Sequence, residues 1–193
     1  MVNLVKSNVY EFQSVYQDML EQFPESELNE FLVYERLLKS NSYELYLVAD
    51  ENKCVGYVMI YRSEDKRIVW LDYIAVFKQF HSNGYGRKII KQLLLTFKGY
   101  NGIFLEVEKP DENNPNTIRR INFYKNLGAK KLDCIYFYPN KNGCVPLDLY
   151  FIPTGEGYIF PSKKETHCVI KDVFSTIHSH HRHLNDVLKK III

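Results

Sequence analysis

The sequence has little of what marks exported, membrane-spanning or nucleic-acid-binding proteins. Its four cysteines show no Cys-x-x-Cys spacing and no signal-peptide pattern precedes them, so we expect reduced thiols. No apolar run reaches the length of a membrane span, which argues against a membrane partner. The formal net charge of +2 is too small to indicate a nucleic-acid partner. Together these absences predict a cytoplasmic protein.

The chain does have enough apolar material for one folded domain. Its 193 residues are 46% hydrophobic and 15% aromatic, which favours a substantial core and argues against long disordered stretches. Hydrophobic periodicity predicts strands over residues 2–6, 43–49, 54–61, 68–76, 103–108, 130–138 and 147–152. It predicts helices over residues 9–23, 25–38, 87–97, 118–127 and 164–193.

The predicted elements divide the chain at about residue 153. Residues 1–153 hold all the predicted strands, whereas residues 154–193 begin with a break at 154–157 and continue as one long amphipathic helix. The apolar stripe of that helix is longer than one small sheet can cover. We therefore expect the extension to pack on the same domain or at a homodimer interface.

Residues 68–95 read as a strand, a glycine turn and a helix suited to holding a diphosphate. The strand ends in Ile74-Ala75-Val76, the turn is His81-Ser82-Asn83-Gly84-Tyr85-Gly86, and Arg87 and Lys88 follow. Glycines let the backbone approach a ligand, and the free N–H groups and dipole of a helix start attract phosphate. The alternative is a plain turn. Neither the dinucleotide fingerprint nor the P-loop fits, because a third glycine and a Gly-Lys-Ser/Thr are both missing.

A second block lies further along the chain. The strand over 103–108 contains Leu105-Glu106-Val107, and the next helix closes with Phe123-Tyr124-Lys125-Asn126-Leu127-Gly128. The two blocks resemble those of the GNAT N-acetyltransferases, whose acetyl-CoA motif is written Arg/Gln-x-x-Gly-x-Gly/Ala; His81 departs from it. The resemblance spans about residues 43–152. It implies an α/β GNAT fold with a central mixed, largely antiparallel sheet of about seven strands, flanked by helices, here with an extra C-terminal helix.

The resemblance also implies acetyl-CoA as co-substrate. It places the thioester against the backbone of Ile74 and Val76, in a slot that opens where this strand leaves its neighbour. It places the diphosphate on the turn and helix start that follow. The implied cofactor-binding residues are Ile74, Ala75, Val76, His81, Ser82, Asn83, Gly84, Tyr85, Gly86, Arg87 and Lys88.

Tyr124 matches the family tyrosine that often protonates the departing CoA thiolate. The reference pKa values of a phenol and a thiol lie within about two units, so the phenol is a credible acid. The alternative role is an aromatic that anchors the helix to the sheet, which the neighbouring Phe123 fits better.

Two acids compete for the role of general base. Glu106 has the family precedent, because a glutamate on a similar strand deprotonates the amine in ribosomal-protein-type members. Asp72 lies on the adjacent strand, expected in the phase of Trp70, Ile74 and Val76. An alkylamine is protonated at pH 7, so a base is useful. The alternative is that both acids only contact substrate or solvent.

The remaining nucleophiles and metal ligands give weaker signals. Cys134 and Cys144 have no legible histidine partner, which argues against an acyl-cysteine route. The run from His178 to His183 holds four histidines on the predicted C-terminal helix. A solvated helix face explains them better than a metal site, because no other ligand lies nearby in sequence. We therefore expect no metal.

The sequence thus predicts an acyltransferase that moves an acetyl group directly to a primary amine of a small molecule. The first alternative is a protein or peptide N-terminal acetyltransferase, which the Leu105-Glu106-Val107 strand favours. The second is a CoA-binding regulatory module with little catalysis. The acceptor is not specified by any motif in the chain.

Overall fold

The computed structural model describes residues 1–155, 157 and 160–193. Its centre is a sheet of eight strands in the order β1-β2-β3-β4-β5-β8-β6, with β7 paired to β8. The strands are β1 (Asn3–Lys6), β2 (Tyr43–Asp50), β3 (Lys53–Ser63), β4 (Ile68–Val76), β5 (Gly102–Glu108), β6 (Lys130–Lys131), β7 (Tyr136–Asn140) and β8 (Gly143–Pro153). The β4–β5 pair is parallel and the other described pairs are antiparallel. The predicted mixed, largely antiparallel sheet is confirmed.

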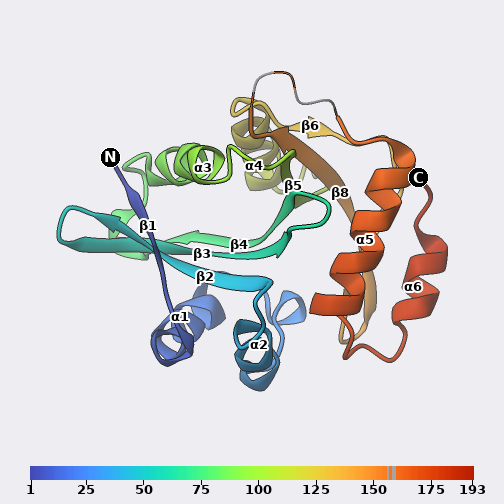
Figure 1. The fold of residues 1–193 in the computed structure, drawn as a ribbon, viewed down its shortest axis with the longest axis horizontal. Helices are drawn as coiled ribbons and strands as arrows, with labels where there is room; N and C mark the ends of the chain where they lie inside the picture. The colour runs from blue at the N-terminus through green and yellow to red at the C-terminus, as the bar shows by residue number, and fades with distance from the viewer. Residues whose placement is uncertain (156, 158–159) are drawn as a thin grey trace.

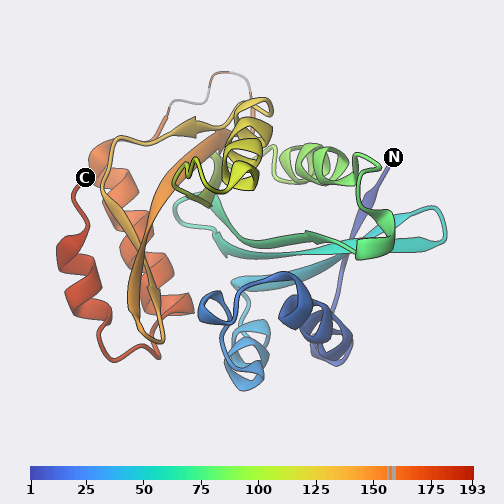
Figure 2. The ribbon, with the colours of Figure 1, turned by 180° about the vertical axis from the view of Figure 1, so that it is seen from behind.

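Helices cover both faces of the sheet (Figures 1 and 2). They are α1 (Val9–Gln22), α2 (Phe31–Leu38), α3 (Tyr85–Thr96), α4 (Pro115–Lys125), α5 (Lys163–Ile177) and α6 (Leu184–Lys190), with short 3₁₀ turns η1 (Glu25–Glu27) and η2 (Lys78–Phe80). α3 and α4 bury their apolar residues on one face, in a core with the side chains of Val58 and Leu105. α1, α2, α5 and α6 share the core of the other face with Trp70 and Phe104.

Side-chain caps define where three of the helices begin. Asn8 and Ser162 form capping boxes at the starts of α1 and α5, and each box satisfies backbone donors that the helix itself leaves open. Asn114 caps α4, whose first residue, Pro115, has no N–H to lose. These residues fix the entry of each helix, and α4 in turn positions Tyr124.

The helix predicted over residues 25–38 is wrong in its first half. Only η1 and α2 are helical, and the chain between them is extended at Leu28. Tyrosine side chains take the hydrogen bonds of Asn29 instead: its N–H donates to the Tyr34 hydroxyl at 3.0 Å, and its carbonyl accepts from Tyr16 at 3.1 Å. Satisfied backbone groups remove the drive to continue a helix here.

The predicted single helix over 164–193 is also wrong, because it divides into α5 and α6. The break lies at His178 to His183 and folds α6 back so that it contacts β7. The apolar stripe therefore covers the sheet, and Phe174 and Val187 join the same core as Trp70. The predicted break at 154–157 lies partly outside the described residues.

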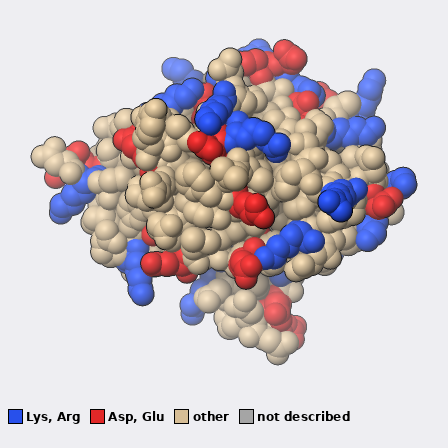
Figure 3. Space-filling view, turned by 90° about the horizontal axis from the view of Figure 1, so that it is seen from below, with Lys and Arg blue, Asp and Glu red and all other residues tan. Residues whose placement is uncertain are grey.

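The strand predicted over 130–138 separates into β6 and β7, which is why the sheet has eight strands rather than seven. Basic and acidic side chains are interspersed on the face seen in Figure 3, so that face carries no broad field of one sign. Among the described residues, no helix combines the length and apolarity that crossing a membrane requires.

Candidate active site

The candidate site lies where two neighbouring strands separate. β4 and β5 pair in parallel only from Ile68 to Leu71 of β4, the last partner of Leu71 being Leu105. Beyond this point β4 continues to Val76, while β5 stays paired with β8 as far as Glu108. The edge of β4 that faced β5 is therefore unpaired over its last residues. The slot expected from the sequence is present.

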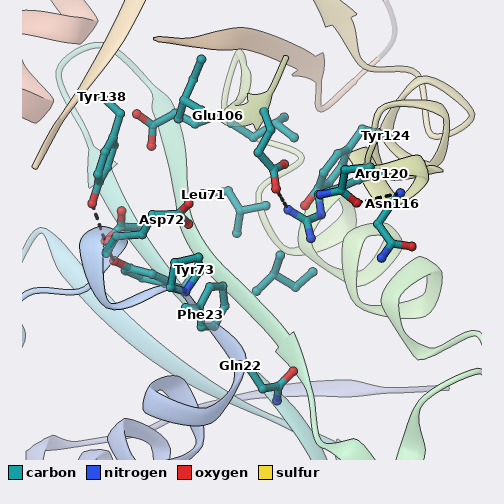
Figure 4. Close-up of a pocket in the computed structure, with 17 residues that line it drawn as sticks. Gln22, Phe23, Leu71, Asp72, Tyr73, Glu106, Asn116, Arg120, Tyr124 and Tyr138 are labelled. Carbon is teal, nitrogen blue, oxygen red and sulfur yellow. Dashed lines mark hydrogen bonds and ion pairs between the residues drawn. The ribbon is translucent and has the colours of Figure 1, made fainter. Parts of the chain in front are cut away.

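A cavity of about 460 Å³ occupies the gap between the two strands. In Figure 4, Glu106, Asp72 and Tyr138 lie toward one side of it, and Tyr124, Arg120 and Asn116 toward the other. The lining residues are Gln22, Phe23, Pro24, Glu27, Leu71, Asp72, Tyr73, Ile74, Leu105, Glu106, Glu108, Asn114, Asn116, Arg120, Tyr124, Tyr138 and Leu147. The three residues predicted to carry the chemistry are thus in one chamber.

A β-bulge at Asp72 sets the direction of its side chain. The register with β3 passes from Ile60↔Leu71 directly to Met59↔Tyr73, so Asp72 is an extra residue without a partner. Asp72 keeps the phase of Trp70, but Ile74 and Val76 pack against the opposite core. The prediction that all four share one face is wrong for the last two, because the bulge reverses the alternation.

Asp72 receives a hydrogen bond from the hydroxyl of Tyr43, a fully buried residue of β2. Burial raises the pKa of the Asp72 carboxyl to about 7, and the Tyr43 hydrogen bond opposes this rise. Asp72 is therefore partly protonated near neutral pH.

Glu106 lies in an equivalent setting on β5. The Tyr136 hydroxyl of β7 donates a hydrogen bond to its carboxylate. Burial raises the pKa of Glu106 to about 8, the Tyr136 hydrogen bond lowers it, and the nearby charges of Asp72 and Glu27 raise it further. A carboxyl with this pKa can take up and release a proton near neutral pH, which suits a general base.

Tyr124 lines the cavity from α4 and is only 7% exposed. Burial raises the pKa of its phenol to about 12, while the charge of Arg120 lowers it. The difference in pKa between the Tyr124 phenol and a thiol is therefore larger than the reference values suggest. The phenol stays protonated and is available as a donor.

The remaining charges of the cavity come from Glu27, Glu108 and Arg120. Arg120 forms an ion pair with Glu108. Burial raises the pKa of Glu27, the charge of Glu108 raises it further, and Arg120 opposes both. The main-chain carbonyl of Glu27 accepts hydrogen bonds from Tyr73 at 2.5 Å and from Tyr138 at 3.1 Å.

The predicted diphosphate turn leads from β4 into α3. Gly84 precedes the helix with φ of +72°, a left-handed conformation that favours glycine, so the first N–H groups of α3 open onto the turn. A Cβ at Gly86 would lie 3.4 Å from the ring of Phe123, which is an ordinary van der Waals contact. The His81 Nε2 lies 2.7 Å from the carbonyl oxygen of Val76, so this side chain ties the turn to the end of β4.

The histidines of the C-terminal segment are not on a solvated helix face as expected. They occupy the turn between α5 and α6, and His178 is fully buried between the rings of Tyr138 and Phe174, at centroid distances of 5.1 and 5.5 Å. Burial lowers the pKa of His178 well below its usual value. Within the described part of the chain, no three His, Cys, Asp or Glu side chains are placed to hold a metal ion.

Sequence reasoning missed several residues that shape the cavity. Tyr43 and Tyr136 hold the two buried acids, and Tyr138 forms part of the wall. Tyr136 and Tyr138 alternate on one strand, which places both on the same face. This alternation of two tyrosines is the sequence pattern from which their shared face could have been predicted.

The fold and the chamber together define an acyltransferase of the GNAT type, and the sequence places the chain in that family. The sequence model of the Acetyltransferase (GNAT) family matches residues 11–129, well over half of the chain. The chain belongs to this family and is an acyltransferase.

Comparison with individual proteins agrees with this assignment. A Bacillus subtilis (strain 168) protein named "Putative acetyltransferase YjbC" is 28% identical over 169 residues, which cover 86% of this chain and 81% of that protein. A GNAT-family structure from Bacteroides thetaiotaomicron has a TM-score of 0.78 at 18% identity, covering 91% of this chain and 97% of that one.

Proteins with different acceptors share the fold. The ribosomal-protein-S18-alanine N-acetyltransferase of Escherichia coli has a TM-score of 0.62 at 17% identity, over 83% of this chain and all of its own. A spermidine N-acetyltransferase of Vibrio cholerae has a TM-score of 0.60 at 14% identity, over 79% of this chain and 94% of its own. Arabidopsis thaliana NAA60 in complex with acetyl-CoA has a TM-score of 0.61 at 13% identity, over 79% of this chain and 98% of its own. Such likenesses show the fold alone.

Proposed function

We propose that this protein transfers the acetyl group of acetyl-CoA directly to a primary amine of a small molecule. The observation that carries the proposal is the single chamber between β4 and β5, which is lined by both Glu106 and Tyr124. A carboxyl able to take a proton and a phenol able to give one are the two groups that amide formation from a thioester needs.

Acetyl-CoA is proposed to enter along the unpaired edge of β4. Backbone groups of Ile74 and Val76 on that edge would hold the thioester and pantetheine, as an added strand pairs with an open sheet edge. The diphosphate would then meet the helix start after Gly84, where free N–H groups and the helix dipole favour negative charge. Arg87 and Lys88, which follow in the first turn, add positive charge.

The reaction then proceeds by attack of the neutral amine on the thioester carbonyl. Glu106, when ionised, takes the proton that the nitrogen loses, directly or through a water molecule. The C–S bond breaks as the carbonyl re-forms, and the departing sulfur receives a hydrogen bond or a proton from the Tyr124 hydroxyl. Because the Tyr124 pKa is about 12, stabilisation by hydrogen bonding is favoured over complete proton transfer.

The protein or peptide N-terminal acetyltransferase stays the second candidate, because the Leu105-Glu106-Val107 strand places the glutamate on the wall of the chamber. A regulatory CoA-binding role is the third. Cytoplasmic location and a homodimer stay predictions.

A screen of acceptors, read by release of the free CoA thiol, separates the candidates. Small amines and short peptides with free N-termini are offered at equal concentration. We expect turnover with small amines and little with peptides. Turnover with peptides alone would support the second candidate, and tight CoA binding without turnover would support the third.

A further inference from the structure

The charges on the cavity wall are strongly unbalanced. Four carboxyl groups line it, those of Glu27, Asp72, Glu106 and Glu108, whereas Arg120 is the one guanidinium among the described lining residues, and no lysine joins it. Arg120 is already paired with Glu108. The other three acids therefore face the chamber without a basic partner from the described lining.

Among the described residues, tyrosine hydroxyl groups donate the closest hydrogen bonds to Asp72 and Glu106. Asp72 accepts from Tyr43, and Glu106 accepts from Tyr136. A phenol stabilises a carboxylate but brings no positive charge, and burial penalises the charged form of both acids. A cation placed between them would supply the attraction that the protein leaves out.

The walls between the acids are aromatic. Phe23 and Tyr73 meet edge to face at a centroid distance of 5.1 Å, and Tyr138 lies on the same side as Asp72 in Figure 4. Ring faces attract ammonium groups and also pack against alkyl chains. Such walls fit an acceptor with a hydrocarbon chain between charged ends.

Tyr124 gives independent evidence that the cavity takes a ligand. Tyr124 is only 7% exposed, and its side chain lines the cavity and is directed into it (Figure 4). Its hydroxyl makes no hydrogen bond with another described side chain and is not among the fully buried polar atoms. A hydroxyl that opens onto the cavity and has no partner among the described residues can donate to a bound molecule.

We propose that the acceptor is a dication, an alkyl diamine or a longer polyamine. One nitrogen loses its proton to Glu106 and is acetylated. The second stays charged and is bound by Asp72 and Glu27 against the Tyr138 ring. The inference rests on the proposed function. Amino acids are poor acceptors on this view, because their carboxylate meets the unpaired acids of the chamber.

The test compares three acceptors of equal chain length that differ only at the far end. They are butylamine, 1,4-diaminobutane and 4-aminobutanoate, with a methyl, an ammonium and a carboxylate group respectively. A hydrogen bond to a charged group corresponds to roughly 10- to 100-fold. We expect kcat/KM for the diamine to exceed that for butylamine by about this factor, and 4-aminobutanoate to be slowest.

A variant then locates the second charge. Asp72→Asn removes a carboxylate with little change in volume and should reduce the diamine-to-butylamine ratio to a few-fold. Asp186→Asn, at an exposed position of α6 outside the cavity, removes the same charge and should keep the parental ratio. The ratio within one variant cancels any loss of folded protein. Glu27→Gln on η1 gives a second reading if Asp72→Asn folds poorly.

The outcomes separate the inference from the function on which it rests. Equal kcat/KM for diamine and butylamine, or a preference for 4-aminobutanoate, would overturn the dication assignment while the amine acetyltransferase stands. If no acceptor releases thiol, the proposed function fails. Calorimetry on the CoA-loaded protein then decides the inference: binding of 1,4-diaminobutane at least tenfold tighter than butylamine supports it, and equal binding refutes it.

Discussion

Removing the Tyr136 hydroxyl should move the pH dependence of catalysis while leaving the fold in place. Tyr136 is fully buried, and its hydroxyl donates to Glu106. Its ring packs between Trp70 and Phe174 at centroid distances of 6.2 and 6.0 Å. Tyr136→Phe keeps these ring contacts and deletes one hydrogen bond to the proposed base.

The size of the effect follows from that hydrogen bond. A hydrogen bond to a charged group contributes about 1.5–3 kcal/mol, which corresponds to about one to two pKa units. Because the bond favours ionised Glu106, its loss raises the Glu106 pKa above the parental value of about 8. At pH 8 the ionised fraction would fall from about half to about a tenth or less, so kcat/KM should fall by about 5- to 50-fold.

The assay is the ratio of parental to variant kcat/KM for one amine between pH 6 and pH 10. The ionisation of the amine is common to both proteins and cancels in the ratio. We expect the ratio to be large at low pH and to fall toward one above the raised pKa. Tyr46→Phe is the matched control, because Tyr46 donates to Glu44 at 2.7 Å outside the cavity. A pH-independent ratio, or one equal to that of the control, would refute the assignment of Glu106 as the base.

Three further predictions follow from the same structure. Tyr124→Phe should lower the rate of the chemical step by about 10- to 100-fold, the contribution of a hydrogen bond to the departing thiolate, with little change in CoA affinity. An unchanged rate in single-turnover kinetics would leave Tyr124 with a packing role only. Gly84→Ala should weaken CoA binding, measured by calorimetry, more than Gly86→Ala does. The reason is that the φ of +72° at position 84 costs a non-glycine residue about 1–3 kcal/mol, whereas a Cβ at position 86 only touches Phe123. Equal losses of affinity would contradict the proposed position of the diphosphate. Burial lowers the pKa of His178 in the folded protein, so as pH falls the histidine is protonated in the unfolded chain before it is protonated in the folded protein. The free energy of unfolding should therefore decrease below about pH 6.5, by up to about 1.4 kcal/mol per pH unit. Asp72 and Glu106 have raised pKa values and change stability with pH in the opposite direction. The measurement is therefore the difference in urea-unfolding free energy between the parent and His178→Phe, taken at pH 7.5 and at pH 5.5. A difference that is the same at both pH values would contradict the role of His178.

The sequence was sufficient for the parts of the site that are local in the chain. β4, the glycine turn and α3 follow one another directly, and the alternation of β5 and the period of α4 are legible over seven and eleven residues. Periodicity and turn residues carry that information without knowledge of the tertiary structure.

The polar partners of the two buried acids could not be predicted in this way. Tyr136 is 30 residues from Glu106, and Tyr43 is 29 residues from Asp72. The first pair meets because β8 lies between β5 and β7, and the second because β2, β3 and β4 are neighbours in the sheet. The division of residues 25–38 was hidden for the same reason, since the tyrosines that satisfy Asn29 become partners only through packing.

The bulge at Asp72 makes the chain length of β4 a functional quantity in its own right. In a regular strand, each residue added or removed sends the side chains that follow to the opposite face of the sheet. Position 72 is the exception, because it is the extra residue of the bulge: deleting it would restore regular alternation and leave Tyr73 on the core of Trp70 and Ile74 on the opposite core. A residue added or removed after the bulge would instead reverse the faces, and the turn into α3 would leave from the wrong side of the sheet. We therefore expect the fold to tolerate loss of position 72 better than the loss or gain of a residue between Tyr73 and Val76.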